Sequence, residues 1–253
     1  MYPDLQANNY MKPFLVLQLR PEDETANNEF EAFLKFGGLD KQETQRERLE
    51  KSGIPDISLN DYSAIIVGGS PFDVSKPEIE KSKIQKQIEK DFTHLFADII
   101  ERDFPFFGAC SGNGLLGSYC GATISSRYSE PVGGVDICLT EEGEKDPLLK
   151  NLPEKFRAMV GHKEACDETP PGSVLLATSD ACPVQMFRVK ENIYATQFHP
   201  EADAEGFIVR INAYKHHGYF PPEEAEILTQ SVQCEETPVP KEILRRFVER
   251  YRS

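Results

Sequence analysis

Two short segments, far apart in the sequence, carry residue types that can do covalent chemistry. In the first, Cys110 lies between Gly108 and Gly112, where an apolar stretch meets a helix-like stretch. In the second, His199 is followed two residues later by Glu201. A cysteine, an imidazole and a carboxylate can serve as the nucleophile, general base and orienting acid of an acyl-transfer site. The sequence therefore predicts a cysteine-based acyl-transfer site, if the fold brings the segments together.

The residues around Cys110 are typical of an exposed nucleophile on a sharp turn between a strand and a helix. Flanking glycines relieve crowding at such a turn. The start of a helix supplies positive potential, which lowers the pKa of a thiol and favours the thiolate. An arbitrary cysteine is more often a small buried hydrophobic residue. We interpret the other cysteines in that way: Cys120, Cys138, Cys166, Cys182 and Cys234.

The residues around His199 favour a role in proton transfer. Pro200 restricts His199 to extended geometry, and residues two apart in an extended segment share a face. Glu201 could therefore orient the imidazole, whose near-neutral pKa suits a general base. Taken alone, this pattern also fits a surface histidine beside a turn. His162, which follows a strand-like segment, could line the same cleft. The remaining histidines fall in helical patterns: His94, His216 and His217.

Alternating strand-like and helix-like segments would position these groups. Apolar runs and alternating patterns predict strands at 14–19, 64–67, 105–108, 132–139, 156–160, 174–178, 184–189 and 193–196. Amphipathic patterns predict helices at 29–35, about 77–102, 115–119, 206–216, 222–232 and 241–251.

This alternation predicts an α/β fold with a single doubly wound, mostly parallel sheet flanked by helices, of flavodoxin-like type. We expect one domain over 1–253 with a helical C-terminal extension from about residue 206. In such sheets, sites form at the carboxyl ends of strands. Both Gly68-Gly69 and Cys110 stand at predicted strand ends.

Composition narrows the choice of partners. The net charge is −14, from 28 basic and 42 acidic residues, which argues against nucleic acid and anionic membranes as partners. Residues 1–5 show no basic region or long apolar run, so we expect no signal peptide. The cysteines form no CxxC pair and no cluster with histidines at zinc spacing. We expect a cytoplasmic protein that needs no metal and no organic cofactor.

The segments Gly108-Ala109-Cys110-Ser111-Gly112 and Gln197-Phe198-His199-Pro200-Glu201 resemble the nucleophile motif and the closing motif of class I glutamine amidotransferases. With Gly68-Gly69, the resemblance covers roughly residues 60–205 and keeps the family's motif order. It implies hydrolysis of glutamine to glutamate and ammonia on an α/β sheet. The most similar subgroup is that of stand-alone proteins similar to the amidotransferase half of GMP synthase.

The resemblance implies a role for each matching residue. Cys110 would attack the side-chain amide to form a γ-glutamyl thioester, His199 would act as base and then as acid, and Glu201 would orient His199. Two further sets are implied: the backbone N–H groups of Gly69 and Ser111 as the oxyanion hole, and Gly68, Gly161 and His162 as binding residues for the substrate.

The sequence departs from the family at one position of the nucleophile motif. Gly114 stands where many members have glutamine, which removes a side chain from the pocket floor. The chain also lacks a phosphate-binding loop for ATP chemistry, so a separate synthetase subunit would have to use the ammonia. Three functions remain open: an amidotransferase subunit that hydrolyses glutamine, a γ-glutamyl peptidase or hydrolase acting on a larger compound, and a catalytically silent binding module.

Overall fold

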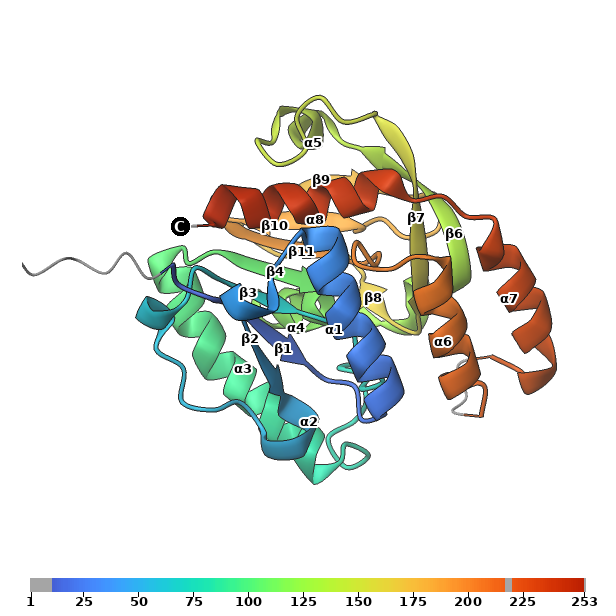
Figure 1. The fold of residues 1–253 in the computed structure, drawn as a ribbon, viewed down its shortest axis with the longest axis horizontal. Helices are drawn as coiled ribbons and strands as arrows, with labels where there is room; N and C mark the ends of the chain where they lie inside the picture. Colours follow the sequence, from blue (N-terminus) through green and yellow to red (C-terminus); the bar gives the residue numbers. More distant parts are fainter. Residues whose placement is uncertain (1–10, 217–219, 253) are drawn as a thin grey trace, which may run out of the picture.

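A nine-stranded sheet with helices on both faces forms the centre of the computed structural model, which describes residues 11–216 and 220–252 (Figure 1). The strand order is β2-β1-β3-β4-β11-β10-β9-β6-β7. The first five strands are parallel, and each later pairing is antiparallel. The predicted fold class is thus confirmed, with the parallel strands gathered in one half of a mixed sheet.

The parallel half consists of β2 (Thr44–Arg48), β1 (Phe14–Gln18), β3 (Ala64–Val67), β4 (Phe106–Ala109) and β11 (Ile193–Thr196). The antiparallel half consists of β10 (Met186–Val189), β9 (Ser173–Thr178), β6 (Glu130–Leu139) and β7 (Lys155–His162). A separate two-stranded sheet pairs β5 (Ile124–Ser125) with β8 (Ala165–Cys166). The helices are α1 (Asp23–Gly37), α2 (Leu49–Ser52), α3 (Lys83–Arg102), α4 (Ser111–Tyr119), α5 (Glu141–Lys145), α6 (Ala204–Tyr214), α7 (Ala225–Gln233) and α8 (Pro238–Tyr251).

Each face of the parallel half has its own hydrophobic core. In β1, Phe14 and Val16 belong to the core under α1 and α8, whereas Leu15 and Leu17 belong to the core under α3 and α4. All four side chains are buried. Because both faces of such a strand are covered, its sequence is an unbroken apolar run, which is why the sequence predicted β1, β3 and β4.

Helix α3 is shorter than its amphipathic pattern predicted. It begins at Lys83, because the Ser82 hydroxyl accepts a hydrogen bond at 3.1 Å from the Gln85 N–H and caps the helix. The preceding residues 77–82 form turns and contain no helix. Among the described residues, no helix is both long enough and apolar enough to span a membrane.

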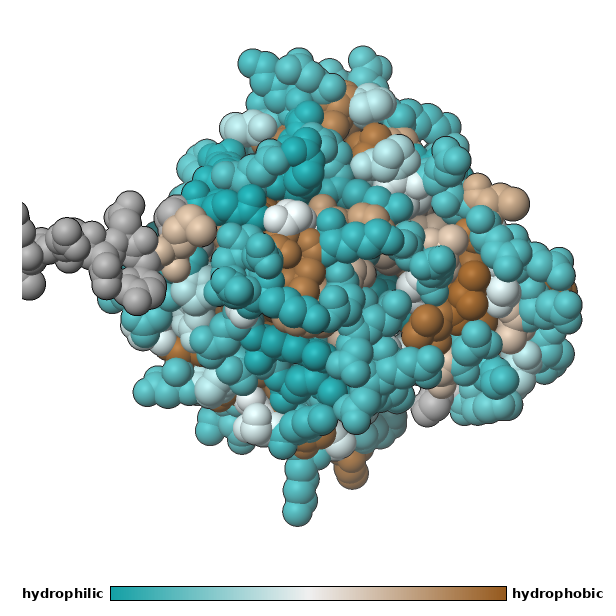
Figure 2. Space-filling model, viewed as in Figure 1, coloured by the Kyte–Doolittle hydropathy of each residue, from teal (hydrophilic) through white to brown (hydrophobic). Residues whose placement is uncertain are grey.

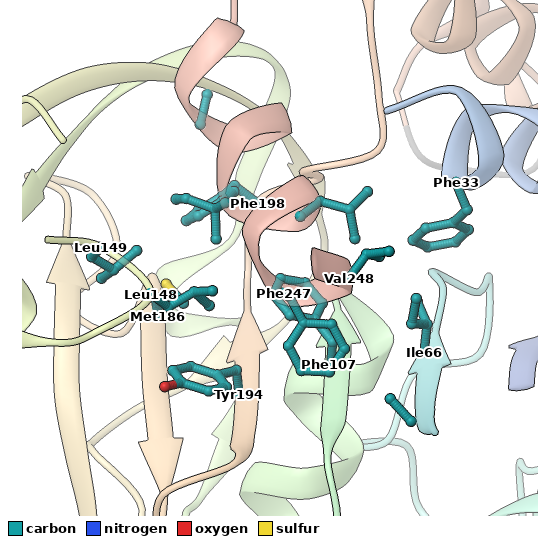
Figure 3. Close-up of a cluster of buried hydrophobic side chains, with 14 of the residues drawn as sticks. Phe33, Ile66, Phe107, Leu148, Leu149, Met186, Tyr194, Phe198, Phe247 and Val248 are labelled. Atoms are coloured by element: carbon teal, nitrogen blue, oxygen red, sulfur yellow. The ribbon is translucent and has the colours of Figure 1, made fainter. Parts of the chain in front are cut away.

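Helix α8 is part of the core rather than a loose extension. The Phe247 ring lies 5.1 Å from the Phe107 ring of β4 and 6.4 Å from the Tyr194 ring of β11, measured between centroids. Figure 3 shows Phe247 and Val248 of this helix above Phe107. The C-terminal helix therefore covers the strands that carry the predicted site. The predicted helix over 206–216 is observed as α6, whereas His217 lies outside the described residues.

Candidate active site

Cys110 forms the turn between β4 and α4, as the sequence predicted. Its φ of 53° and ψ of −96° are unusual for a residue with a side chain, and such strain clusters at active sites. Two backbone hydrogen bonds hold the turn. The Cys110 N–H donates to the Thr196 carbonyl at 2.8 Å, and the Cys110 carbonyl accepts from the Asn113 N–H at 2.9 Å.

The glycines beside Cys110 are needed for close backbone approach. A Cβ on Gly108 would lie 2.8 Å from the carbonyl carbon of Gly112. That contact is with backbone, which cannot move aside as a side chain can. A Cβ on Gly112 would lie 3.4 Å from the Val67 side chain, which is less severe. The sharp turn at Cys110 thus depends most on Gly108.

His199 and Glu201 reach Cys110 because their strand is the neighbour of β4. β11 pairs with β4 in parallel, with Thr196 opposite Ala109, so the chain leaves both strands at the same edge of the sheet. His199 Nδ1 lies 2.8 Å from Glu201 Oε1, and both side chains are buried. This contact leaves Nε2 of His199 for the thiol, and both His199 and Cys110 line one cavity.

Arg210 is a member of this group that the sequence analysis missed. It lies on α6, is buried, and donates from Nη2 to Glu201 Oε1 at 2.8 Å. Its Nη1 lies 3.1 Å from His199 Nδ1. A single arginine in a helix gives no sequence signal, because only the packing of α6 against this edge of the sheet places it there.

The surroundings shift the pKa values of all three predicted catalytic residues. Burial raises the pKa of Cys110 to about 12, partly opposed by Arg20. Burial also lowers the pKa of His199. Burial by itself would raise the pKa of Glu201, but His199 and Arg210 hold it far below its ordinary value. At neutral pH the site therefore holds a thiol, a neutral imidazole and a carboxylate.

This outcome contradicts the lowered thiol pKa that the sequence predicted for Cys110. The position at the start of α4 is as expected. Removal from water, however, penalises the charged thiolate more than the nearby positive groups stabilise it. The other cysteines are also free: Cys166 and Cys182 are buried, Cys120 and Cys138 are half-buried, and Cys234 is exposed, contrary to its predicted burial.

The glycine pair after β3 makes room for a buried ion pair. A Cβ on Gly68 would lie 2.4 Å from Glu29 Oε1, and one on Gly69 would lie 2.5 Å from Arg20 Nη2. Arg20 Nε donates to Glu29 Oε2 at 2.5 Å, and both side chains are buried. The Gly69 N–H also donates to Glu29 Oε2, at 3.2 Å. This donor, expected in the oxyanion hole, is thus already engaged on the side of Glu29.

The remaining predicted residues lie at or beside a cavity next to Cys110. Ser111, Gly161 and His162 line this cavity of about 350 Å³, and Gly114 forms part of its wall. Gly68 is not among the residues that line it, which departs from its expected role in substrate binding. The Ser111 N–H belongs to the first turn of α4 and has no partner within the helix.

A second group of the same residue types lies behind this cavity. His162 Nε2 lies 2.8 Å from Glu130 Oε2, and the ligand atoms of Glu130, His162 and Cys182 lie within 4.8 Å of one another. Their types and spacing could hold a metal ion. Glu130 Oε2 is already engaged by His162 and by Gln185 Nε2 at 2.6 Å. Cys182 is buried and lines neither cavity at Cys110, so Cys110 is the better candidate nucleophile.

Comparison with known proteins places these residues in context. A family model described as glutamine amidotransferase class-I matches residues 39–208. One of the two most similar relatives considered is a subunit of the glutamine-hydrolyzing GMP synthase of Pyrococcus abyssi, which is 29% identical over 149 residues that cover 58% of this chain and 71% of that protein. The corresponding subunit of Methanococcus maripaludis is 35% identical over 103 residues, which cover 40% of this chain. The chain spans about half (53%) of that relative.

Solved structures with the same fold cover nearly the whole chain. A glutamine amidotransferase from Thermotoga maritima has a TM-score of 0.74 and 21% identity, over 95% of this chain and 98% of that one. The corresponding GMP synthase subunit of Thermoplasma acidophilum, described as putative, has a TM-score of 0.61 and 17% identity, over 94% of this chain and 93% of that one. At these identities the likeness concerns the fold.

Proposed function

Because the chain belongs to the class I glutamine amidotransferase family, we propose that it hydrolyses the side-chain amide of glutamine to glutamate and ammonia at Cys110. The observation that carries the proposal is the arrangement at the edge of the sheet. A cysteine on a strained turn and a buried His199–Glu201 pair leave adjacent parallel strands and line one cavity. These are the nucleophile, base and orienting group of acyl-transfer chemistry.

The protonation states define the first step. Because Cys110 is a thiol in the free site, its proton passes to His199 Nε2 as the sulfur attacks the amide carbon. Glu201 holds the imidazole through Nδ1 and stabilises the imidazolium that forms. The Ser111 N–H is placed to stabilise the oxyanion, a contribution worth about 3 kcal/mol for one donor.

The second half releases both products. The C–N bond breaks, His199 returns its proton to the leaving nitrogen, and ammonia departs from a γ-glutamyl thioester on Cys110. Water then adds to the thioester with His199 as base, the C–S bond breaks, and glutamate leaves with Cys110 again a thiol. Each proton taken by His199 is returned within the same half-reaction, so the cycle needs no oxidant, reductant or metal.

The cavity lined by Ser111, Gly161 and His162 has the chemistry to hold the amino acid end of glutamine. Asp73 and Lys163 line it as well and pair with each other at 3.0 Å. Groups of opposite sign suit an ammonium and a carboxylate on the same carbon.

We further infer that the ammonia is used by a separate synthetase protein, since the relatives from Pyrococcus abyssi and Methanococcus maripaludis are named as subunits of GMP synthase. The six free cysteines support a reducing cytoplasm as the compartment.

The test is release of glutamate from L-glutamine by the purified protein. Cys110→Ala should abolish the release, whereas Cys182→Ser, which alters the other cysteine with a histidine and a glutamate beside it, should retain it. A glutamine-analogue electrophile should label Cys110. Loss of activity in the Cys182 variant with activity retained in the Cys110 variant would assign the chemistry to the other group and refute the proposal.

A further inference from the structure

Cys110 lies between two cavities that differ in their walls. Both are lined by Ser70, Cys110 and Gly161. The first, described above, carries His162 and charged groups on its far side. The second has a volume of about 430 Å³ and is lined by His199, which the first is not. The nucleophile therefore faces one space away from the catalytic imidazole and another beside it.

The position of His199 decides which side receives the leaving group. A general acid must lie within hydrogen-bond reach of the atom that it protonates. In the proposed reaction that atom is the amide nitrogen. Any substituent on the nitrogen must then extend into the cavity that His199 lines, while the glutamyl part occupies the first.

The second cavity is larger and more apolar than ammonia requires. Its walls include the side chains of Val132, Phe207, Ile211 and Phe220. Figure 2 shows hydrophobic side chains gathered on the surface near α6, where these residues belong to one cluster. Mostly apolar walls with a few polar groups are typical of sites for small organic molecules.

The charged residues of this cavity are already compensated. Arg20 pairs with Glu29 at 2.5 Å and Arg210 pairs with Glu201 at 2.8 Å. Since each guanidinium faces a buried carboxylate, the cavity has little net charge to attract an ionic group. Its walls favour an uncharged apolar one.

We propose that this protein also cleaves γ-glutamyl amides whose nitrogen carries an apolar substituent, which binds in the cavity formed by Val132, Phe207, Ile211 and Phe220. This inference rests on the proposed hydrolysis at Cys110 and adds a substrate class to it. The chemistry is unchanged: the C–N bond breaks and the leaving nitrogen, protonated by His199, departs as a primary amine instead of ammonia.

A series of γ-glutamyl alkylamides, from methyl to butyl, tests the cavity directly. The leaving amines have nearly the same basicity, so chain length alone changes. We expect kcat/KM to rise by about fourfold for each methylene that enters the cavity. A series that is flat or that falls with chain length would overturn the inference. If glutamine is still hydrolysed in that case, the proposed function stands; if neither glutamine nor any amide reacts, the proposed function fails as well.

Two variants locate the effect within the molecule. Val132 is only half-buried, so Val132→Phe can fill the cavity from its wall and should lower the ratio of butylamide to methylamide turnover. Gly114→Ala alters the other cavity and should leave this ratio unchanged. The ratio is internal to each variant and does not depend on how much protein is folded. An unchanged ratio in Val132→Phe would place the alkyl group elsewhere and refute the assignment.

Discussion

The raised pKa of Cys110 predicts how its reactivity changes with pH. With a pKa of about 12, about one side chain in 10⁵ is a thiolate at pH 7. Alkylation by iodoacetamide requires the thiolate. We therefore expect the rate at Cys110 to rise about tenfold per pH unit from pH 7 to pH 10, without a plateau. A free cysteine derivative should level off above its ordinary pKa of about 8.5.

The measurement is the pH profile of alkylation, read on the Cys110 peptide by mass spectrometry. The variant Cys234→Ser removes the exposed competing thiol. Circular dichroism at each pH confirms that the protein stays folded. The slope, rather than the absolute rate, carries the result, because partial burial also slows the reagent.

A plateau at or below pH 7 would refute the reasoning. It would mean that Cys110 exists as a thiolate paired with a protonated His199, so that burial does not control the site. A steep profile would mean that the proton leaves the thiol only as the substrate is attacked. The enzyme would then resist oxidation and adventitious alkylation between turnovers.

Three further predictions concern activity and stability. Glu201→Gln should lower kcat for glutamate release by about 10²–10⁴-fold, because an amide cannot stabilise the imidazolium and leaves Arg210 buried without its carboxylate; near-normal kcat would show that Glu201 does not orient the base. In urea denaturation, Gly114→Ala should raise the free energy of unfolding by about 0.5–1 kcal/mol, since its Cβ has 3.8 Å to the nearest side chain, whereas Gly108→Ala should lower it through backbone contact; equal effects would contradict the close approach at the turn. Phe247→Ala should lower the free energy of unfolding by about 3–5 kcal/mol; a loss below about 1 kcal/mol would mean that α8 is not part of the core.

The sequence predicted the parts of the fold that depend on local patterns. Buried parallel strands are apolar throughout, and the Cys110 turn is marked by glycines within a few residues. Strand β2 was missed because Thr44–Arg48 is polar and lies at the edge of the sheet, where no residue is fully buried. Its backbone pairs with β1 although its side chains carry no strand signal.

The features of the site that the sequence could not predict depend on contacts between distant elements. Arg210 reaches Glu201 only because α6 packs beside β11. The Gly69 N–H is taken by Glu29, which comes from α1. The pKa of Cys110 follows from how much water the whole fold excludes. None of these is encoded in the spacing of residues along one segment.

The hydrogen bond from the Cys110 N–H to the Thr196 carbonyl has a consequence for how the protein acquires activity. The strands that it joins are separated by the whole antiparallel half of the sheet in chain order. During synthesis, the nucleophile emerges well before the strand that delivers its base. A nascent chain that ends before residue 201 holds the cysteine but no imidazole–carboxylate pair. Competence for hydrolysis thus arises only when β11 docks between β4 and β10, and activity itself reports that this late step of folding is complete.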